Sequence, residues 1–592
     1  MSFLVTTSPV SSNFQLSSSG YESSNSGIDN IQASQPISGP AVVPGTSSCL
    51  RDAKFKANAE SMIAIDPVNP SHLVGASHFI YGFQPGGGSF AGSVGVHAST
   101  DGGLTWSNQI IPGFDCLTSA KSRLIYRTYD PVIAFDDVGS LYAAILPDTS
   151  PNAGANLPLY VTKSTDGVNW NVANGGMPVF VAGSSAGSAD KQWIIVDNYR
   201  SSPFFGSIYV VWVAFHGYGN SDILLSKSTD SGQTFSKPIQ VSPSQPGTIG
   251  FAWPIPALAP DGTLYVNFIK YISCSNCNTL DEMVAKSTDG GNTFGSPSTI
   301  ASKVLWHIYP YPNTVFRDGI YQSFTVNPAN GNLLLALENA IGGYCYGPTG
   351  QCYGVVAADT NILLYESTDG GLSWNQPITV NDDSDEPTNQ FQPVVAASPS
   401  GLVAVAFYDR RLACPSGSGI KPNDVGKKNI CIDTSIQFFT DMASLSRVGQ
   451  NIRATKSNWD PNNAGTLGKG KDDKLPFIGD YFGLALTNTM AYALFTANFD
   501  LGGNPTYDMQ AIVARIKAPV NLATTTTSVS TEIASTQPVS TGVTTASAST
   551  SEQSAAGPFG IPGFGWGSIL IGLACGVVVL ALRRRNRIWK KG

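Results

Sequence analysis

The stretch Ser99-Thr100-Asp101-Gly102-Gly103-Leu104-Thr105-Trp106 recurs along the chain. Three further copies of this length begin at Ser228, Ser287 and Ser367, and a copy one residue shorter spans Ser164 to Trp170. Each copy lies between short apolar or alternating runs, which is typical of a β-hairpin with an Asp-Gly turn. Similar units at a nearly fixed period predict a repeat architecture.

The residue types of the repeat are those that a tight turn requires. Serine and aspartate oxygens can accept backbone N–H groups, glycine tolerates positive φ, and the closing aromatic ring can pack back between strands. Such a turn needs no substrate. We therefore predict a structural role for the aspartate of every copy, namely Asp101, Asp166, Asp230, Asp289 and Asp369.

The pattern S-x-D-x-G-x-T-W resembles the Asp-box, or BNR repeat, which occurs in sialidases and in many non-enzymatic β-propellers. This resemblance implies a sialidase-like propeller in which the Asp-box turns lie away from the active-site face. The sialidases of the family have six blades.

A second repeated unit, two apolar strands joined by a turn, accompanies the first and gives the blade count. Blades of four strands then predict an all-β, seven-bladed propeller, and an N-terminal segment could complete the last sheet. A six-bladed, sialidase-like propeller is the alternative. The seven units are Glu60 to Ser77, Asp130 to Ile145, Gln192 to Ala214, Trp253 to Ile269, Gln322 to Leu337, Gln392 to Tyr408 and Gly479 to Ala497.

The flanking segments differ from the propeller in composition. Residues 1–48 are rich in Ser, Gly, Asn and Pro, which predicts disorder, and residues 49–518 form the propeller. A Ser/Thr-rich stalk follows at 519–560, an uncharged apolar run at 565–582, and a basic tail at 583–592. That run is long enough for a minimal transmembrane helix with a cytoplasmic basic end.

Pro562-Gly563-Phe564, between the stalk and the apolar run, resembles the PGF-type C-terminal sorting signal of archaeal surface proteins. The resemblance implies that the span is cleaved and replaced by a lipid anchor; otherwise the span itself is the anchor. Both readings predict a cell-surface protein with an extracellular propeller.

The charge distribution argues against nucleic acid as a partner. Six of the 34 basic residues lie in the last ten positions, so the rest of the chain carries 28 basic and 41 acidic residues. An acidic domain without a basic stripe does not attract phosphate backbones. We expect an extracellular glycan or a surface protein instead.

Eight of the nine cysteines precede the C-terminal apolar run, and their spacing predicts disulfides in an oxidising compartment. A metal knuckle at Cys274 and Cys277 is the less favoured reading. The three close pairs are Cys274 with Cys277, Cys345 with Cys352 and Cys414 with Cys431, leaving Cys49 and Cys116.

An up-and-down strand order places these close pairs. The start of the first strand and the loop between the second and third strands lie on one face, and the Asp-box turns lie on the other. The three cysteine pairs fall in the second-to-third-strand loops of blades four, five and six. Disulfide-braced loops on one face predict the binding surface.

On the predicted binding face we looked for the groups that a sialidase-like mechanism requires. By the family resemblance these are arginines for a substrate carboxylate, a tyrosine nucleophile paired with a glutamate, and an acid/base aspartate. The parts occur, but their arrangement does not match the family, and whether the protein is an enzyme stays open. The catalytic candidates are Arg127, Asp130, Arg410, Arg411, Tyr481 and Glu338.

Four residues are the ligand-binding candidates: Trp193, Trp253, Asp409 and Asp480. Asp130, Trp193, Trp253 and Tyr481 recur at the starts of first strands and should surround the central opening, where aromatic rings could stack on sugars or plug the channel. Asp409, Arg410 and Arg411 are also explained by an ion-pair network that closes the ring between the first and last blades, which we favour.

No metal site or cofactor is predicted, although the acidic run Asp382-Asp383-Ser384-Asp385-Glu386 could bind Ca²⁺. The leading functional hypothesis is a surface-anchored propeller that binds a glycan or protein through its disulfide-braced loop face. A sialidase-like exo-glycosidase is the first alternative, and a structural cell-envelope protein is the second.

Overall fold

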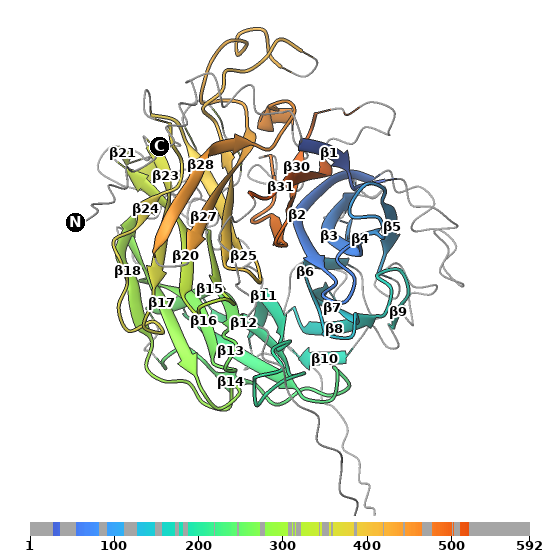
Figure 1. Cartoon of the computed structure of the whole chain (residues 1–592), viewed down its shortest axis with the longest axis vertical. Coiled ribbons are helices and arrows are strands. Elements are labelled where there is room, and N and C mark those ends of the chain that lie inside the picture. Colours follow the sequence, from blue (N-terminus) through green and yellow to red (C-terminus); the bar gives the residue numbers. More distant parts are fainter. Residues whose placement is uncertain are drawn as a thin grey trace, which may run out of the picture.

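The protein is a seven-bladed β-propeller, seen in a computed structural model (Figure 1). The structure describes residues 28–35 and most of 55–519. The gaps are 82–90, 112–126, 149–156, 172–176, 182–186, 218–219, 245–247, 273–278, 306–320 except 311, 314 and 316, 342–343, 346–354, 357–358, 384–386, 418–419, 442–443, 464–475, 500 and 502–508.

The first four blades follow one another along the chain, each starting with its innermost strand. Blade 1 contains β2 (Phe55–Ile65), β3 (Leu73–Tyr81), β4 (Ala91–Ser99) and β5 (Ser107–Ile110). Blade 2 contains β6 (Arg127–Phe135), β7 (Leu141–Asp148), β8 (Leu159–Ser164) and β10 (Met177–Phe180), with β9 (Trp170–Asn171) also paired to β8. Blade 3 contains β11 (Ser188–Val196), β12 (Ile208–Gly217), β13 (Asn220–Ser228) and β14 (Ile239–Gln240). Blade 4 contains β15 (Ile249–Leu258), β16 (Leu264–Ile272), β17 (Thr279–Ser287) and β18 (Ser298–Leu305).

The last three blades include one insertion and one strand from the N-terminal region. Blade 5 contains β19 (Gln322–Val326), β20 (Leu333–Ile341), β23 (Asp359–Ser367) and β24 (Ile378–Thr379), with the small pair β21 (Tyr344–Cys345) and β22 (Val355–Val356) between β20 and β23. Blade 6 contains β25 (Gln390–Ala397), β26 (Leu402–Asp409), β27 (Asp433–Asp441) and β28 (Leu445–Arg453). After η2 (Pro461–Asn463), blade 7 contains β29 (Gly483–Leu486), β30 (Met490–Ala497), β31 (Gln510–Lys517) and β1 (Ile28–Gln32).

The ring closes through the first strands and through β1. Each first strand contacts the first strand of the next blade, and β29 of blade 7 contacts β2 of blade 1. In Figure 1, β1 lies beside β31, its antiparallel partner from the other end of the chain. The prediction of seven blades is confirmed, and the six-bladed alternative is wrong. β1 lies within the segment 1–48 expected to be disordered, and it is the N-terminal strand that completes the last sheet.

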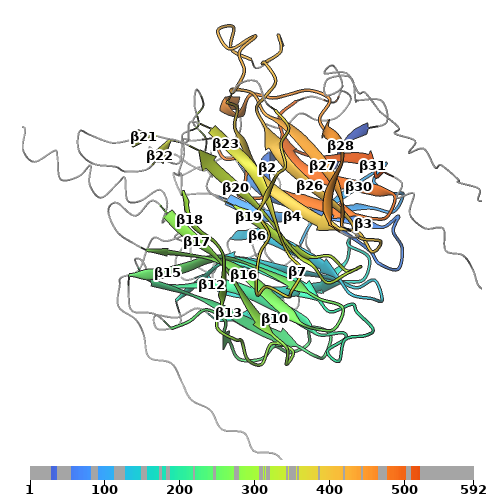
Figure 2. The ribbon, with the colours of Figure 1, turned by 60° about the vertical axis from the view of Figure 1, so that its left-hand side comes forward.

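Successive residues of a strand are apolar where both faces of the blade are buried against neighbouring blades. In β12, Val210, Trp212 and Ala214 pack in the cluster shared with blade 2. Their sequence neighbours Tyr209, Val211 and Val213 pack in the cluster shared with blade 4. Side chains of a strand point alternately to opposite faces, so a two-sided core requires apolar residues at successive positions. Figure 2 shows the same blades turned by 60° about the vertical axis.

Each copy of the Asp-Gly repeat forms a turn held by its own aspartate. In the turn between β17 and β18, Asp289 Oδ1 accepts hydrogen bonds from the Ser287 hydroxyl at 2.8 Å and from the Asn292 and Thr293 N–H groups, both at 3.0 Å. Asp289 Oδ2 accepts the Thr293 hydroxyl at 2.6 Å. Close variants of this set occur around Asp101, Asp166, Asp230 and Asp369.

These turns join third to fourth strands, so they lie on the face opposite the loops between second and third strands. One of the opposite loops, between β26 and β27, carries the disulfide Cys414–Cys431. For the other six predicted cysteines, the side chains lie outside the described residues: Cys49, Cys116, Cys274, Cys277, Cys345 and Cys352.

Within the described residues, no helix is long and apolar enough to cross a membrane. The predicted stalk, span and basic tail begin at 519 and lie almost wholly beyond that part of the chain.

Candidate functional site

The first strands of five blades carry the same backbone irregularity near their starts. Each has a register shift at a residue with φ between 46° and 54°. These residues are Glu60, Asp130, Lys191, Trp253 and Gln392. Positive φ is strained for a side chain other than glycine, and a bulge of this kind redirects side chains. Five blades therefore each hold a residue with a strained backbone at the same level of the central channel.

A cavity lies at this level, in the part of the channel where the first strands begin. It has an empty volume of about 520 Å³, which includes open solvent. Its walls are mainly apolar and aromatic, and its polar groups are few. Its lining residues include Asp130, Lys191, Trp193, Trp253, Tyr321, Asp480 and Tyr481, together with Gln192 and Gln322.

Four aromatic side chains from four different blade starts form two edge-to-face pairs in the wall. The ring centroids of Trp193 and Tyr481 are 6.0 Å apart with an interplanar angle of 62°. Those of Trp253 and Tyr321 are 5.7 Å apart at 83°. The Tyr481 hydroxyl donates to the Pro131 carbonyl at 3.3 Å, which fixes its ring. Edge-to-face pairs of this kind hold aromatic walls in place.

A buried ion cluster, which we call the Lys191 hub, forms the polar side of the cavity. The Lys191 ammonium lies 2.5 Å from Asp480 Oδ2, 3.2 Å from Asp130 Oδ2 and 3.8 Å from Glu60 Oε1. The Tyr321 hydroxyl donates to Asp480 Oδ1 at 2.8 Å. These residues come from blades 1, 2, 3 and 7 and from the start of blade 5, so a single ammonium links the first blades to the last.

Burial and neighbouring charges shift the pKa values of Glu60 and Asp130 in opposite directions. Burial, together with the negative charges of Asp130 and Asp480, raises the pKa of Glu60 well above its usual range despite the nearby ammonium. Burial also acts to raise the pKa of Asp130, but Lys191 and a hydrogen bond with Glu60 hold it below its usual value. Glu60 thus keeps a proton that it shares with the ionised Asp130.

The same balance keeps Lys191 charged. Burial alone would lower its pKa, but the carboxylates around it, Asp130 first, raise the pKa well above its usual value. Behind the hub, burial raises the pKa of Asp190 to about 6. At neutral pH the cluster therefore contains one ammonium and a larger number of carboxylates.

Three glutamine side chains stabilise the irregular first strands from neighbouring blades. Gln192 donates its amide to the Asp130 carbonyl, Gln322 to the Trp253 carbonyl at 2.8 Å, and Gln392 to the Gly479 carbonyl at 2.9 Å. Within the described residues, the side-chain oxygens of Gln192 and Gln322 and the Trp253 indole N–H have no hydrogen-bond partner. Buried groups without partners are uncommon, and they lie here in the wall of one cavity.

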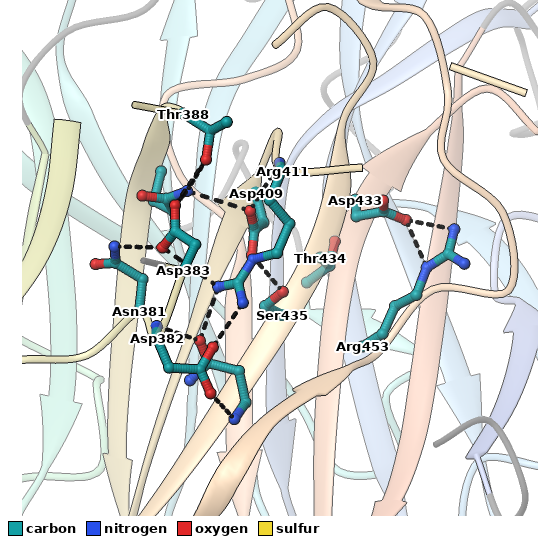
Figure 3. Close-up of polar contacts among 12 residues, drawn as sticks. Asn381, Asp382, Asp383, Thr388, Asp409, Arg411, Asp433, Thr434, Ser435 and Arg453 are labelled. Atoms are coloured by element: carbon teal, nitrogen blue, oxygen red, sulfur yellow. Dashed lines mark hydrogen bonds and ion pairs between the residues drawn. The ribbon is translucent and has the colours of Figure 1, made fainter. Parts of the chain in front are cut away.

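Asp409 and Arg411 belong to a second cluster, the Arg411 hub, shown in Figure 3. Arg411 Nε lies 2.7 Å from Asp409 Oδ2, Nη1 lies 2.6 Å from Asp382 Oδ1, and Nη2 lies 3.7 Å from Asp383 Oδ1. Asp382 and Asp383 follow blade 5, whereas Asp409 and Arg411 lie at the end of β26 in blade 6. The expected ion-pair network thus exists, but it joins blades 5 and 6 rather than the first and last.

Arg410 is fully buried beside a tyrosine–glutamate pair. The Tyr311 hydroxyl donates to Glu338 Oε1 at 2.8 Å, and the Arg410 guanidinium lies 5.5 Å from the Tyr311 ring centroid. Arg410 also donates to the Thr314 hydroxyl and to the Asn429 carbonyl. The relative exposure of Arg410 and Glu338 is 0% and that of Tyr311 is 2%. The three groups therefore cannot touch a substrate in this structure.

The remaining candidates do not assemble into a sialidase-like site. Arg127 is the first residue of β6, and its side chain lies outside the described residues. None of the described residues that line the cavity is an arginine. The structure brings Asp130, Trp193, Trp253, Asp480 and Tyr481 together at the cavity and leaves Asp409, Arg410, Arg411 and Glu338 elsewhere.

The acidic run proposed for Ca²⁺ is engaged by basic and amide groups where it is described. Asp382 pairs with Arg411, and Asp383 accepts hydrogen bonds from Asn381 at 2.7 Å and Thr388 at 2.7 Å. Residues 384–386 lie in a gap of the description. In the described ranges, no three His, Cys, Asp or Glu residues are arranged to hold a metal ion.

Sequence reasoning missed Glu60, Lys191 and Tyr321. A usable signal was present for the first two, because Glu60 and Lys191 occupy in their blades the position of Asp130, at or next to the start of the repeated two-strand unit. Aligning the seven unit starts would have placed them in one layer. Tyr321 precedes its unit start Gln322 by one residue, as Lys191 precedes Gln192, so the same alignment would have placed it in this layer as well.

No family model and no curated protein matches the chain. Solved structures with distant similarity include a Trypanosoma rangeli sialidase, at 16% identity and a TM-score of 0.39 over 69% of this chain and 59% of that chain. A Penicillium chrysogenum α-L-arabinanase complexed with arabinobiose gives 11% identity and a TM-score of 0.36 over 62% and 94% of the two chains. A Dyadobacter fermentans protein of unknown function gives 14% identity and a TM-score of 0.37 over 65% of this chain and 94% of that chain. Similarity this distant assigns no activity to this chain.

Proposed function

We propose that the protein binds a carbohydrate in the cavity at the start of its first strands. The observation that carries this proposal is the aromatic wall, in which Trp193, Trp253, Tyr321 and Tyr481 surround a cavity of about 520 Å³. Sugar rings present apolar C–H faces that stack on aromatic rings. A hollow with mainly apolar and aromatic walls and a few polar groups is typical of small-molecule sites.

The polar groups in the wall suit hydroxyl ligands. The side-chain oxygens of Gln192 and Gln322 are acceptors, and the Trp253 indole is a donor, and all three lack partners among the described residues. These three atoms are themselves buried, so the polar atoms that a sugar hydroxyl can reach belong to more exposed lining groups such as the Asp130 side chain, which is 12% exposed. The glutamine amides already fix the two glutamine side chains, so little ordering is needed on binding.

Binding is favoured over sialidase-like hydrolysis. A sialic acid requires a cationic clamp, whereas the only cation among the described lining residues is Lys191, which already contacts three carboxyl groups. The tyrosine–glutamate pair Tyr311–Glu338 is buried away from solvent. No specific observation favours the structural cell-envelope alternative.

We also propose that the propeller is held at the cell surface by the C-terminal segment. The support for this is the Ser/Thr-rich stretch 519–560, the uncharged apolar run 565–582 and the basic residues that follow it. In this arrangement the cavity faces extracellular glycans. Protease shaving of intact cells should release the propeller; its retention inside unbroken cells would contradict this placement.

The binding proposal is tested with the full-length protein on a glycan array, followed by calorimetry on a retained sugar. Trp253→Ala should weaken binding by about tenfold or more, since burying a large apolar side chain contributes about 1.5–3 kcal/mol. Leu372→Ala is the matched control, because Leu372 is 85% exposed on the opposite face. Absence of any retained glycan, or equal affinity of both variants and wild type, would refute the proposal. Turnover of a fluorogenic sialoside would favour the enzyme instead.

A further inference from the structure

The charge of the cavity discriminates between sugars that carry an amine, a neutral group or a carboxylate. Of the described lining residues, Asp130 and Asp480 carry carboxylates and Lys191 carries the ammonium. Behind them lie Asp190 and the carboxyl of Glu60, which is 2% exposed. Glu60 keeps its proton and lies 3.5 Å from His78, so among the described groups the negative charge set against the ammonium comes from Asp130, Asp480 and Asp190, and a cleft with low-dielectric walls concentrates that field.

A carboxylated sugar meets this field unfavourably. Lys191 lies within 3.2 Å of two carboxylate oxygens, so its charge is already engaged. A third carboxylate near Lys191 would also lie near Asp130 and Asp480. Like charges at such distances destabilise each other, and the desolvation of the incoming anion adds to the cost.

A cation meets two favourable features at once. The faces of Trp193, Trp253 and the two tyrosines carry negative π density, which attracts an ammonium group. Asp130 is the most exposed carboxyl group of the hub, since its side chain is 12% exposed against 1% for Asp480 and 2% for Glu60. An amine beside Asp130 would share this carboxylate with Lys191, 3.2 Å away, and the negative charge of Asp480 and the aromatic rings would offset the repulsion between the two cations.

We infer that the cavity selects a sugar that bears a protonated amine over the same sugar with a neutral or carboxylate substituent, with Asp130 as its anchor. This inference rests on the proposed carbohydrate site and specifies the class of its ligand. It leaves the identity of the sugar ring, the linkage and the chain length to the test.

The test compares three probes of equal length with the full-length protein: oligomers of glucosamine, of N-acetylglucosamine and of a hexuronic acid. At low ionic strength the glucosamine oligomer should bind about tenfold more tightly than the N-acetylated one. The hexuronate should bind most weakly. Asp130→Asn should bring the ratio of the first two affinities close to one, whereas Asp382→Asn, in the Arg411 hub, should leave it unchanged.

The outcomes distinguish this inference from the proposed function. Equal binding of the amine and N-acetyl probes, or preference for the hexuronate, overturns the charge selection and leaves a carbohydrate site in place. Failure of all three probes and of the glycan array overturns the site itself. If Asp130→Asn does not fold, the wild type decides alone, because the amine preference must fall as salt screens the charges. A preference that is independent of salt contradicts the inference.

Discussion

The Lys191 hub and the Arg411 hub are built from similar parts. Three acidic residues surround each central cation, namely Glu60, Asp130 and Asp480 around Lys191 and Asp382, Asp383 and Asp409 around Arg411, and the Arg411 hub has a second cation, Arg447, 3.8 Å from Asp382. Each joins elements from different blades. Composition alone does not distinguish them, and in the sequence the Arg411 hub is the more visible of the two because its residues occur in short runs.

Their surroundings differ. In the Arg411 hub, Asp383 also accepts from Asn381, Thr388 and Gln390, and Asp409 accepts from Ser435 at 2.8 Å (Figure 3). Such saturation by neutral donors is typical of a structural network. In the Lys191 hub, the residues stand on strained bulges, face an aromatic cavity and include a carboxyl group of strongly raised pKa. Strain and perturbed acidity beside a cavity are typical of functional sites.

Removing the cation from each hub tests this difference with the largest expected effect. Lys191→Met leaves Asp130 and Asp480 buried without the ammonium, and should lower the free energy of unfolding by about 3–5 kcal/mol. Arg411→Met should cost less, about 2 kcal/mol, because Asp382 is 26% exposed and keeps Arg447, while the buried Asp409 keeps the Ser435 hydroxyl. Urea unfolding of the full-length protein measures both.

Arg200→Met is the control for this pair of variants. Arg200 pairs with Asp137 at 2.7 Å, but its side chain is 78% exposed. Its loss should change stability by less than about 0.5 kcal/mol. If Lys191→Met behaves like this control, the hub does not tie the first blades to the last.

The disulfide Cys414–Cys431 gives the Arg411 side of the ring a covalent brace. Its sulfurs close a loop with a sequence separation of 17. Replacing both cysteines by serine should cost about 3 kcal/mol by freeing the unfolded chain. Thermal unfolding with and without reductant measures this, and the response to reductant should be smaller in the double variant than in the wild type. Loss of sugar affinity in this variant would show that the loop, rather than the cavity alone, carries binding.

The shared proton of the Lys191 hub predicts a pH effect. Glu60 has a raised pKa in the folded protein, so above about pH 4.5 the unfolded chain releases this proton while the folded protein keeps it. This contribution to stability is complete at lower pH and is lost as pH rises toward the folded pKa. In Glu60→Gln, the side-chain amide can still donate a hydrogen bond to Asp130, but the titratable carboxyl proton is absent.

The variant should therefore gain on the wild type by at least about 1 kcal/mol between pH 5 and pH 8. Urea unfolding at both pH values measures the gain. The matched comparison is with Gln322→Asn, which introduces no titratable group and should show the same difference in stability from the wild type at both pH values. A gain for Glu60→Gln that is independent of pH would mean that Glu60 is ionised in the folded protein.

The sequence was sufficient for the fold because turn chemistry and alternation act locally. The Ser–Asp–Gly turns and the repeated apolar strand pairs are set by neighbouring residues, so the blade count followed from spacing. β1 was harder, because five residues in a polar segment acquire their strand only by pairing with β31 from the far end of the chain.

The site was predicted in part. The positions of Asp130, Trp193, Trp253 and Tyr481 in the repeat predict that they surround the central opening, and they line one cavity. The ring-closing network was assigned to Arg410 and Arg411 because consecutive charges stand out in a sequence. Which cation meets which carboxylates depends on the radial position of each strand, and burial at the channel decides their acidity. Neither is encoded by spacing within one blade.

The smallest predicted effect concerns the opposite face, where Asp289 organises its turn. Hydrogen bonds from the Thr293 hydroxyl and N–H and from Ser287 lower the pKa of Asp289 from 3.8 to about 2. A depressed folded pKa contributes stability above about pH 3.8, which is lost as pH falls toward about 2. Asp289→Ala should cost about 1 kcal/mol near neutral pH. This difference from wild type should shrink below pH 4 in acid unfolding, with Leu372→Ala showing no such change. Because the turn lies on the face away from the cavity, sugar affinity should stay at the wild-type value; a weaker affinity would mean that the two faces are coupled.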